Sequence, residues 1–144
     1  LAASFLNFVL GALGVTQAMT QFIDGLGLGA FGTLMVIVLA YLVLGCFMET
    51  LSMLITTTPL IAPIVFALGY DPVWFGILLT VLLETALITP PVGVNLYVVQ
   101  GIRPRGGMND VIMGSLPFVL MMFVMIGLLI AFPQIALWLP SLFY

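Results

Sequence analysis

The sequence predicts an all-α membrane protein with a re-entrant helical hairpin and one helix that is broken in its middle. Hydrophobic residues make up 64% of the 144 residues and charged residues only 5%, whereas soluble domains carry about a quarter charged residues. The mean hydropathy is +1.40. Several of the uncharged runs, at 1–23, 25–48, 50–70, 85–102 and 111–144, reach the roughly 20 residues needed to cross a bilayer.

The first 30 residues are expected to hold the end of a transmembrane helix, a short second helix and a glycine-rich turn. Gly14 with Thr16 allows a break between the two helical pieces, and Asp24 opens the turn, which we place at a membrane interface. The chain opens on Leu1, without an initiator methionine or the charged start of a signal peptide. We therefore expect a fragment.

Residues 31–70 are expected to form a helical hairpin, although two topologies fit them. Glu49, Thr50 and Ser52 interrupt the apolar pattern. In one topology, 31–57 crosses the membrane as a single helix. In the other, 31–48 and 52–68 form a hairpin that enters and leaves on one side, with residues 49–52 at a tip near mid-membrane, where polar groups need partners.

Residues 71–109 are expected to form a broken transmembrane helix and a loop. Adjacent prolines at 90 and 91 remove two backbone N–H donors, so 73–101 is divided into two half-helices. The loop 102–110 carries both arginines and is expected in the cytoplasm. Within the region 110–144 the last helix is predicted over 111–138, with Trp138 and Tyr144 as interface anchors and a periplasmic C-terminus.

Two carboxylates are candidate functional groups. Glu49 has 24 uncharged residues before it and 21 after it, and a charge deep in a bilayer normally faces a cavity, an ion or a partner. The alternative is a helix end at the membrane surface. Glu84 lies about 20 Å along the helix from Asp71. It is either a proton or sodium group or a residue that supports the break.

The break itself is a candidate binding site. The carbonyls of Ile88, Thr89 and Pro90 lose their helical partners, and sodium prefers oxygen ligands. The half-helix after the break directs free N–H groups at the same place, which favours an anion. Gly93 and Asn95 favour a site over a simple proline kink.

Enzyme chemistry and nucleic-acid binding are not expected. The chain has no histidine, no zinc-ligand spacing and no glycine-rich phosphate loop. With two basic residues in all, it offers no basic surface for nucleic acid.

Five motifs together resemble the C-terminal third of the large membrane subunit of tripartite ATP-independent periplasmic (TRAP) transporters. They are LGCFME at 44–49, PLIAPI at 59–64, LGYDPVWFGI at 68–77, ITPPVGVNL at 88–96 and PQIALWLP at 133–140. The resemblance covers nearly the whole chain in the right order.

The resemblance implies a multi-pass protein of the bacterial inner membrane that imports organic acids, such as C4-dicarboxylates or sialic acid, with sodium. It implies the second half of an inverted repeat, moving by an elevator mechanism. The expected partners are the remainder of the large subunit, a small membrane subunit, a periplasmic binding protein and the lipid bilayer.

The resemblance also assigns residues to a site between the hairpin tip and the break. By analogy with sodium/dicarboxylate symporters, the expected sodium ligands are Gly45, Glu49, Ile88, Thr89, Pro90 and Gly93, several through backbone carbonyls. The expected substrate-binding residues are Thr50, Ser52 and Asn95. The alternatives are a structural or degenerate membrane component, or another sodium/anion symporter that needs no binding protein.

Overall fold

In the computed structural model, helices make up all the regular secondary structure of the described residues, as the sequence predicted. The structure describes residues 5, 9, 11–14, 18, 21, 25, 27–90 and 93–142. The expected elements of the first 30 residues, with Asp24, lie largely outside the described residues, as do Pro91 and Tyr144. The elements are α3 (Gly29–Gly45), α4 (Thr50–Ala67), α5 (Pro72–Ile88), α6 (Val94–Ile102), α7 (Met108–Ala131), α8 (Gln134–Leu137) and the 3₁₀ turn η1 (Pro140–Leu142).

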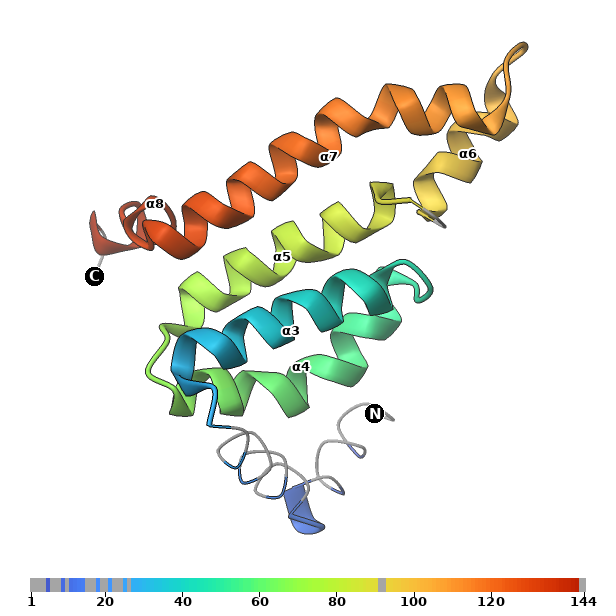
Figure 1. The fold of residues 1–144 in the computed structure, drawn as a ribbon. Coiled ribbons are helices and arrows are strands. Elements are labelled where there is room, and N and C mark those ends of the chain that lie inside the picture. The colour runs from blue at the N-terminus through green and yellow to red at the C-terminus, as the bar shows by residue number, and fades with distance from the viewer. Residues whose placement is uncertain are drawn as a thin grey trace.

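Helices α3 and α4 form a hairpin. Figure 1 shows α4 running back alongside α3 after a short turn. Because α3 ends at Gly45 and α4 begins at Thr50, residues 31–57 are not one continuous helix. The two helices form a hairpin, and its re-entry into the membrane stays a prediction. Thr50 and Ser52 belong to the first turn of α4. We call residues 45–49 the hairpin tip.

A hydroxyl pair holds the two arms of the hairpin together. The hydroxyl oxygens of Tyr41 and Thr57 are 2.8 Å apart, and Thr57 Oγ1 lies 2.7 Å from the carbonyl oxygen of Met53. A threonine hydroxyl has one proton. If Thr57 gives it to Met53, as helical threonines often do, Tyr41 donates to Thr57. Tyr41 is buried, so this bond is shielded from competing solvent.

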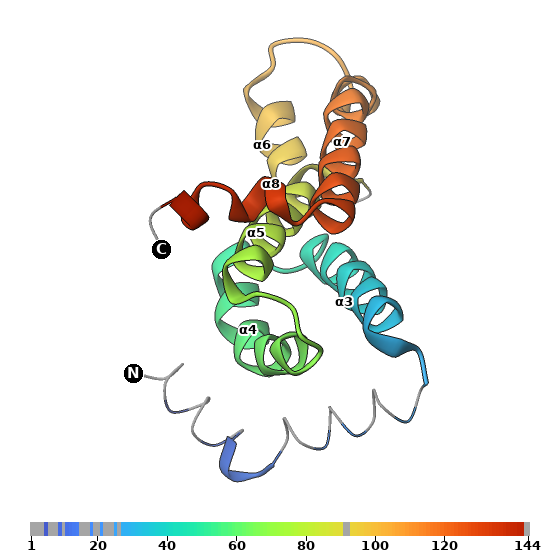
Figure 2. The same ribbon diagram turned by 90° about the vertical axis from the view of Figure 1, so that its left-hand side faces the viewer.

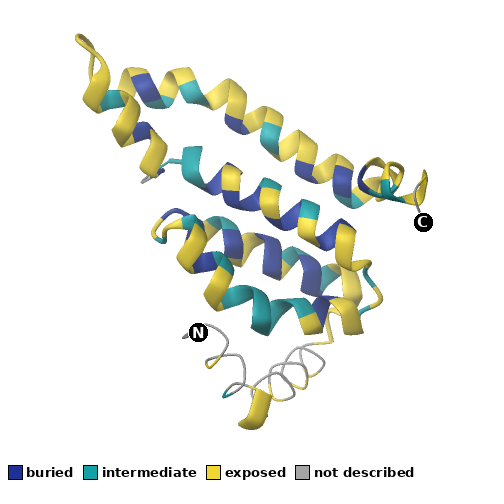
Figure 3. Cartoon of the chain, turned by 180° about the vertical axis from the view of Figure 1, so that it is seen from behind, coloured by how far each residue is buried: buried dark blue, intermediate teal, exposed yellow. Residues whose placement is uncertain are grey.

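Helix α5 is the centre of the fold, with the hairpin on one side and α7 on the other (Figure 2). Trp74, Leu78, Leu82 and Ala86 follow one another at intervals of one turn and are all essentially inaccessible. Asp71 caps the start of the helix by accepting hydrogen bonds from the backbone N–H groups of residues 73 and 74. Figure 3 shows the buried positions concentrated on α3 and α5.

Helix α7 packs against both halves of the broken helix, α5 and α6. Its 24 residues extend about 36 Å. The prediction that this helix continues to residue 138 is wrong. It ends at Ala131, and the short α8 follows, because Pro133 has no N–H and disfavours helical backbone at Phe132.

The indole of Trp74 ties α5 to the end of α7. Pro133 lies four residues after Leu129, so the Leu129 carbonyl lacks its usual helical donor. Trp74 Nε1 donates to that carbonyl at 2.8 Å. A cross-helix bond therefore replaces the missing one at a buried position.

Apolar surface covers much of the outside of the molecule. Helices α4 and α7 are long and apolar enough to cross a membrane, and α3 and α5 are apolar helices of 17 residues. Large apolar side chains are exposed along α3, α6 and α7, such as Leu39, Val98 and Met121. Contiguous apolar surface of this kind is typical of proteins that contact lipid or partner helices.

Candidate ion and substrate site

The hairpin tip packs directly against the last turns of α5, and we call this contact the seam. Gly45 and Ala86 are both buried there. A Cβ added at Gly45 would overlap the Cβ of Ala86 and lie 3.6 Å from Met53 Sδ. The absence of a side chain at Gly45 therefore allows the tip to reach the end of α5.

Cys46 continues the seam toward the break, which we define as residues 89–93. Its Sγ lies 3.2 Å from the carbonyl oxygen of Leu42 and 3.9 Å from that of Thr89. The Thr89 hydroxyl donates to the Thr85 carbonyl at 2.6 Å. The side chain of Thr89 thus bonds back to its own helix, while its carbonyl lies toward the hairpin.

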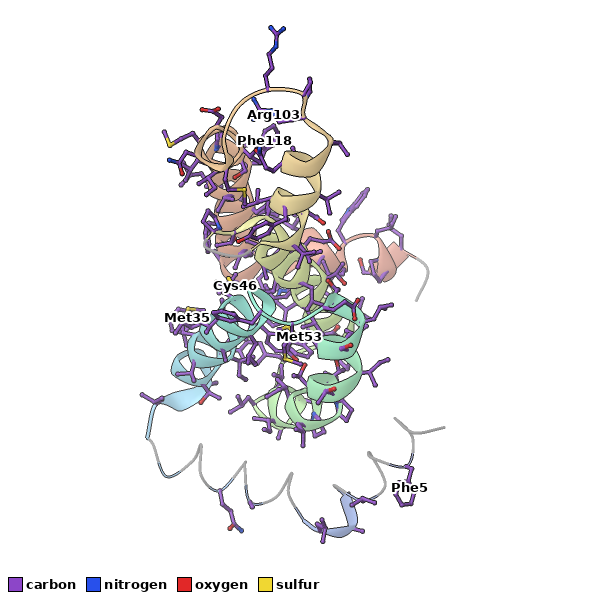
Figure 4. All side chains as sticks on the ribbon, turned by 90° about the vertical axis from the view of Figure 1, so that its right-hand side faces the viewer. Phe5, Met35, Cys46, Met53, Arg103 and Phe118 are labelled. Atoms are coloured by element: carbon purple, nitrogen blue, oxygen red, sulfur yellow. The ribbon has the colours of Figure 1, made fainter. Side chains whose placement is uncertain are left out.

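An open cavity of about 290 Å³ lies at the seam. Its lining comes from the end of α3, the hairpin tip and the break: Leu39, Leu42, Val43, Cys46, Phe47, Thr89 and Pro90. Figure 4 labels Cys46 at this position, where the end of α3 faces α5.

The backbone at the break brings main-chain oxygens together. Pro90 and Pro91 lack N–H groups, so the carbonyls of Ala86 and Leu87 lose the donors that a continuous helix would supply. Ala86 instead accepts from the Thr89 N–H at 3.3 Å, whereas no N–H from residue 91 reaches Leu87.

Gly93 adopts a backbone conformation that suits glycine, with a φ of +35°. A Cβ at Gly93 would lie 3.0 Å from both the Leu87 and the Thr89 carbonyl oxygens. Two carbonyl oxygens therefore converge on this buried glycine. Carbonyl oxygens are ligands that hard cations such as sodium accept.

Glu49 has a local structural role. It is exposed and is the N-cap of α4, where its carboxylate accepts from Leu51 N at 2.8 Å, Ser52 N at 2.9 Å and Ser52 Oγ at 3.0 Å. Both carboxylate oxygens thus bind the first turn of α4. Thr50 is half-buried and Ser52 is exposed.

The other predicted residues lie apart from the seam cavity. Asn95 is exposed and, with the half-buried Ile88, lines a second cavity between α6 and α7. Glu84 is exposed on the face of α5 that also carries Gly76 and Thr80. The structure therefore brings Gly45, Thr89 and Pro90 to the seam and places Gly93 against the Thr89 carbonyl. Asn95 lines the other cavity, and Glu84 lies on an exposed face of α5.

Sequence reasoning missed three contributors, Cys46, Ala86 and Leu87. Leu87 carries a usable signal, because Pro91 stands four residues after it. Across the described part of the chain, no three cysteine, aspartate or glutamate side chains lie close enough together to hold a metal ion. The break offers a cation the carbonyl oxygens of Leu87 and Thr89.

Residues 1–135 match the model of the family described as tripartite ATP-independent periplasmic transporter, DctM component. The chain belongs to this family of TRAP transporter large permeases. It is 39% identical over 140 residues to the C4-dicarboxylate TRAP transporter large permease protein DctM of Vibrio cholerae, a match that covers 97% of this chain and 31% of the relative.

Relatives with other substrates in their names are also similar. The sialic acid TRAP transporter large permease protein SiaM of Vibrio cholerae is 37% identical over 110 residues, covering 76% of this chain and 26% of SiaM. The ectoine TRAP transporter large permease protein TeaC of Halomonas elongata is 36% identical over 134 residues, covering 93% of this chain and 29% of TeaC. The chain thus spans about a third of the length of these TRAP permeases.

Membership in the DctM family makes the chain a component of a membrane transporter. Its relatives are permeases, which carry solutes across membranes and are not enzymes. The apolar exterior of α4 and α7 fits a permease within a bilayer.

Proposed function

We propose that this chain is the C-terminal part of a TRAP transporter large permease and forms half of its transport site, at the seam. The observation that carries the proposal is the contact of Gly45 with Ala86, together with the approach of Cys46 to the Thr89 carbonyl. A hairpin tip that packs closely on a broken helix can bind one ion between the two elements.

The proposed coupling ion is sodium, co-transported with the substrate. The Leu87 and Thr89 carbonyls are the most favourable ligands at the break, with further oxygens from Ile88, Pro90 and Gly93. Gly45 would contribute its carbonyl from the hairpin. An ion held by oxygens of both elements would draw the tip onto the break, which links ion binding to closure of the site.

The proposed substrate is an organic acid. Helix α6 begins at Val94, and its N-cap Gly93 has no side chain, so no capping side chain competes with a carboxylate for the N–H groups of Val94 and Asn95. The Leu96 N–H donates to the Gly93 carbonyl at 2.8 Å. Thr50 and Ser52 would approach the substrate from the start of α4, and Asn95 from α6. Glu49 would keep the first turn of α4 in place and add negative potential for the cation.

Transport by an elevator movement is part of the proposal. The hairpin α3–α4 would re-enter the membrane, and the loop 102–110 would face the cytoplasm, with the C-terminus in the periplasm. A periplasmic protein would deliver the acid, and a small membrane subunit with the rest of the large subunit would complete the inner-membrane complex.

A structural role for this part of the permease is the second candidate, favoured by the capping bonds of Glu49. Three substitutions in the complete transporter distinguish it. Glu49→Ser keeps a capping side chain but removes the charge. Glu49→Asp keeps the capping side chain and the charge, and Glu49→Ala removes both.

Sodium-driven uptake into proteoliposomes is the assay. Under the proposal, the serine and alanine variants lose at least about tenfold in uptake, since about 1.4 kcal/mol of lost stabilisation is a factor of ten, while the aspartate variant retains most of it. If serine restores uptake as well as aspartate, Glu49 is only a cap. If the alanine variant transports normally, the site is not at this tip.

Two further measurements test the ion and the delivery of substrate. Sodium, but not choline, should raise the unfolding temperature of the purified transporter, because a ligand that binds only the native state stabilises it. Omitting the binding protein should stop uptake. Uptake that persists without the binding protein would identify a symporter of another type.

A further inference from the structure

We infer that the groove between α6 and α7 binds an anionic phospholipid, with the phosphate at Arg103 and an acyl chain along the apolar walls. The groove is a cavity of about 330 Å³ at the end of the molecule opposite the C-terminus. It shares no lining residue with the seam cavity, although Ile88 and Asn95 in its lining also belong to the proposed transport site. The inference rests on the membrane location of the chain and does not depend on sodium binding.

Three side chains at regular spacing form the α6 side of the groove. Asn95, Val99 and Arg103 line the groove at intervals of four residues, which is about one helical turn each. The groove therefore extends about 12 Å along α6. Its outer end is Arg103, the residue that caps the C-terminus of α6.

The α7 wall combines the apolar Val111 and Phe118 with the polar Asp110 and Ser115, and it has a gap at its centre. Val111 and Phe118 line the groove on either side of Gly114. A Cβ added at Gly114 would meet nothing within 4 Å. This glycine leaves space between the flanking side chains, which suits a flexible acyl chain.

Charge at the groove is confined to its outer end. Arg103 is exposed, and Figure 4 shows it at the end of the molecule where the loop joins α6 to α7. Asp110 also lines this end, but its Oδ2 accepts a hydrogen bond from the Gly107 N–H at 2.9 Å and caps α7. The Arg103 guanidinium lies near this carboxylate, since a Cβ at Gly106 would lie 2.7 Å from Asp110 Oδ2 and 3.0 Å from Arg103 Nη2. Arginine has five N–H donors, and those directed away from Asp110 can bind a phosphate as a pair.

A phospholipid fits this arrangement better than a free anion does. A charged loop at the end of two apolar helices lies at the membrane surface, so Arg103 is at headgroup depth while Val99 and Phe118 are nearer the hydrocarbon. A phosphate ion would use Arg103 and leave the apolar walls uncovered. Basic groups at grooves between membrane helices are known to attract anionic headgroups.

A bound lipid would steady the second half of the broken helix. Helix α6 has only 9 residues, and helices so short are marginal without packing. Leu96 is the buried residue of α6 and also lines the groove. A lipid chain there would fill the space between α6 and α7.

Native mass spectrometry of the purified full-length protein tests the inference. Phosphatidylglycerol and phosphatidylcholine with matched chains are added, and the bound lipids are counted. The wild type should bind phosphatidylglycerol at least about fivefold more tightly than phosphatidylcholine, since one interfacial arginine contributes about 1 kcal/mol.

Each test variant has a matched control in the same element. Arg103→Gln should remove the preference for phosphatidylglycerol, whereas Arg105→Gln, in the same loop but outside the groove, should keep it. Gly114→Leu should fill the groove and weaken binding of both lipids. Gly127→Leu is the control, because its added Cβ also meets nothing within 4 Å and Gly127 lies outside the groove.

Three results overturn the inference. One is that Arg103→Gln keeps the same preference for phosphatidylglycerol as Arg105→Gln. Another is that millimolar inorganic phosphate displaces the lipid, which would indicate a site for free anions. The third is that a folded Gly114→Leu protein retains wild-type binding, which would mean that protein and not lipid covers the groove. If Gly114→Leu fails to fold, the arginine pair decides.

Discussion

Adding one methyl group at Gly45 should push the hairpin tip away from α5 at the seam. The Cβ of Gly45→Ala would overlap the Cβ of Ala86, which is fully buried. Neither atom is at the end of a flexible side chain, so the backbone of the hairpin tip or of α5 has to move. The same methyl should be harmless at Gly76, a helical position of α5 where an added Cβ meets nothing within 4 Å.

The magnitude follows from two opposing contributions. Overpacking of a buried contact costs about 1–3 kcal/mol, and replacing a helical glycine by alanine returns about 0.5–1 kcal/mol. Gly45→Ala should therefore destabilise the protein by about 1–2 kcal/mol. Ala86→Gly should cost a similar amount, because it loses both helix propensity and about 0.8 kcal/mol of buried methyl.

The double variant is the decisive test. With Gly45→Ala and Ala86→Gly together, the methyl moves across the seam and the overlap disappears, so stability should return to within about 0.5 kcal/mol of the wild type. Unfolding in detergent gives the free energies, and sodium-driven uptake by the complete transporter should fall and recover in parallel.

Two results would refute this reasoning. Additive effects of the two substitutions would show that Gly45 and Ala86 do not touch. A Gly76→Ala control as unstable as Gly45→Ala would show that the cost is not specific to the seam.

Two other variants probe the ends of α5. Trp74→Phe should destabilise the protein by about 1–3 kcal/mol, since the buried Leu129 carbonyl loses its donor; thermal unfolding measures the loss, and the exposed Trp138→Phe should change little. Gly93→Ala should cost at least about 1 kcal/mol, because its φ is +35° and the new methyl would meet two carbonyl oxygens at 3.0 Å. Gly101→Ala, in open space, should be neutral or slightly stabilising, and equal effects at the two glycines would contradict the assigned geometry of the break.

Features that depend on neighbouring residues could be predicted from the sequence. Pro90 and Pro91 lack N–H groups whatever surrounds them, so the end of α5 near residue 88 followed from local chemistry. The composition likewise predicted apolar helices. The end of α7 could be predicted in the same way, because Pro133 stops the helix. The prediction of a helix over 111–138 instead followed the apolar pattern that continues beyond Pro133.

The role of Glu49 shows where a sequence pattern is ambiguous. A carboxylate within a long apolar run predicts a functional group, and the same carboxylate one residue before a helix predicts an N-cap. The choice requires knowing where α4 begins. The structure places that start at Thr50 and gives Glu49 the capping bonds, while a part in ion binding stays a proposal.

The sequence by itself determined the membrane character, the family motifs and the position of the break, because each depends on residue types or on neighbours within about one turn. Only the tertiary structure decided which residues meet. Gly45 and Ala86 are 41 positions apart, and their contact depends on how the hairpin turns and packs on α5. It also placed Asn95 in the groove with Arg103, away from the seam. Such contacts depend on the angles between helices, which the packing of many side chains fixes together.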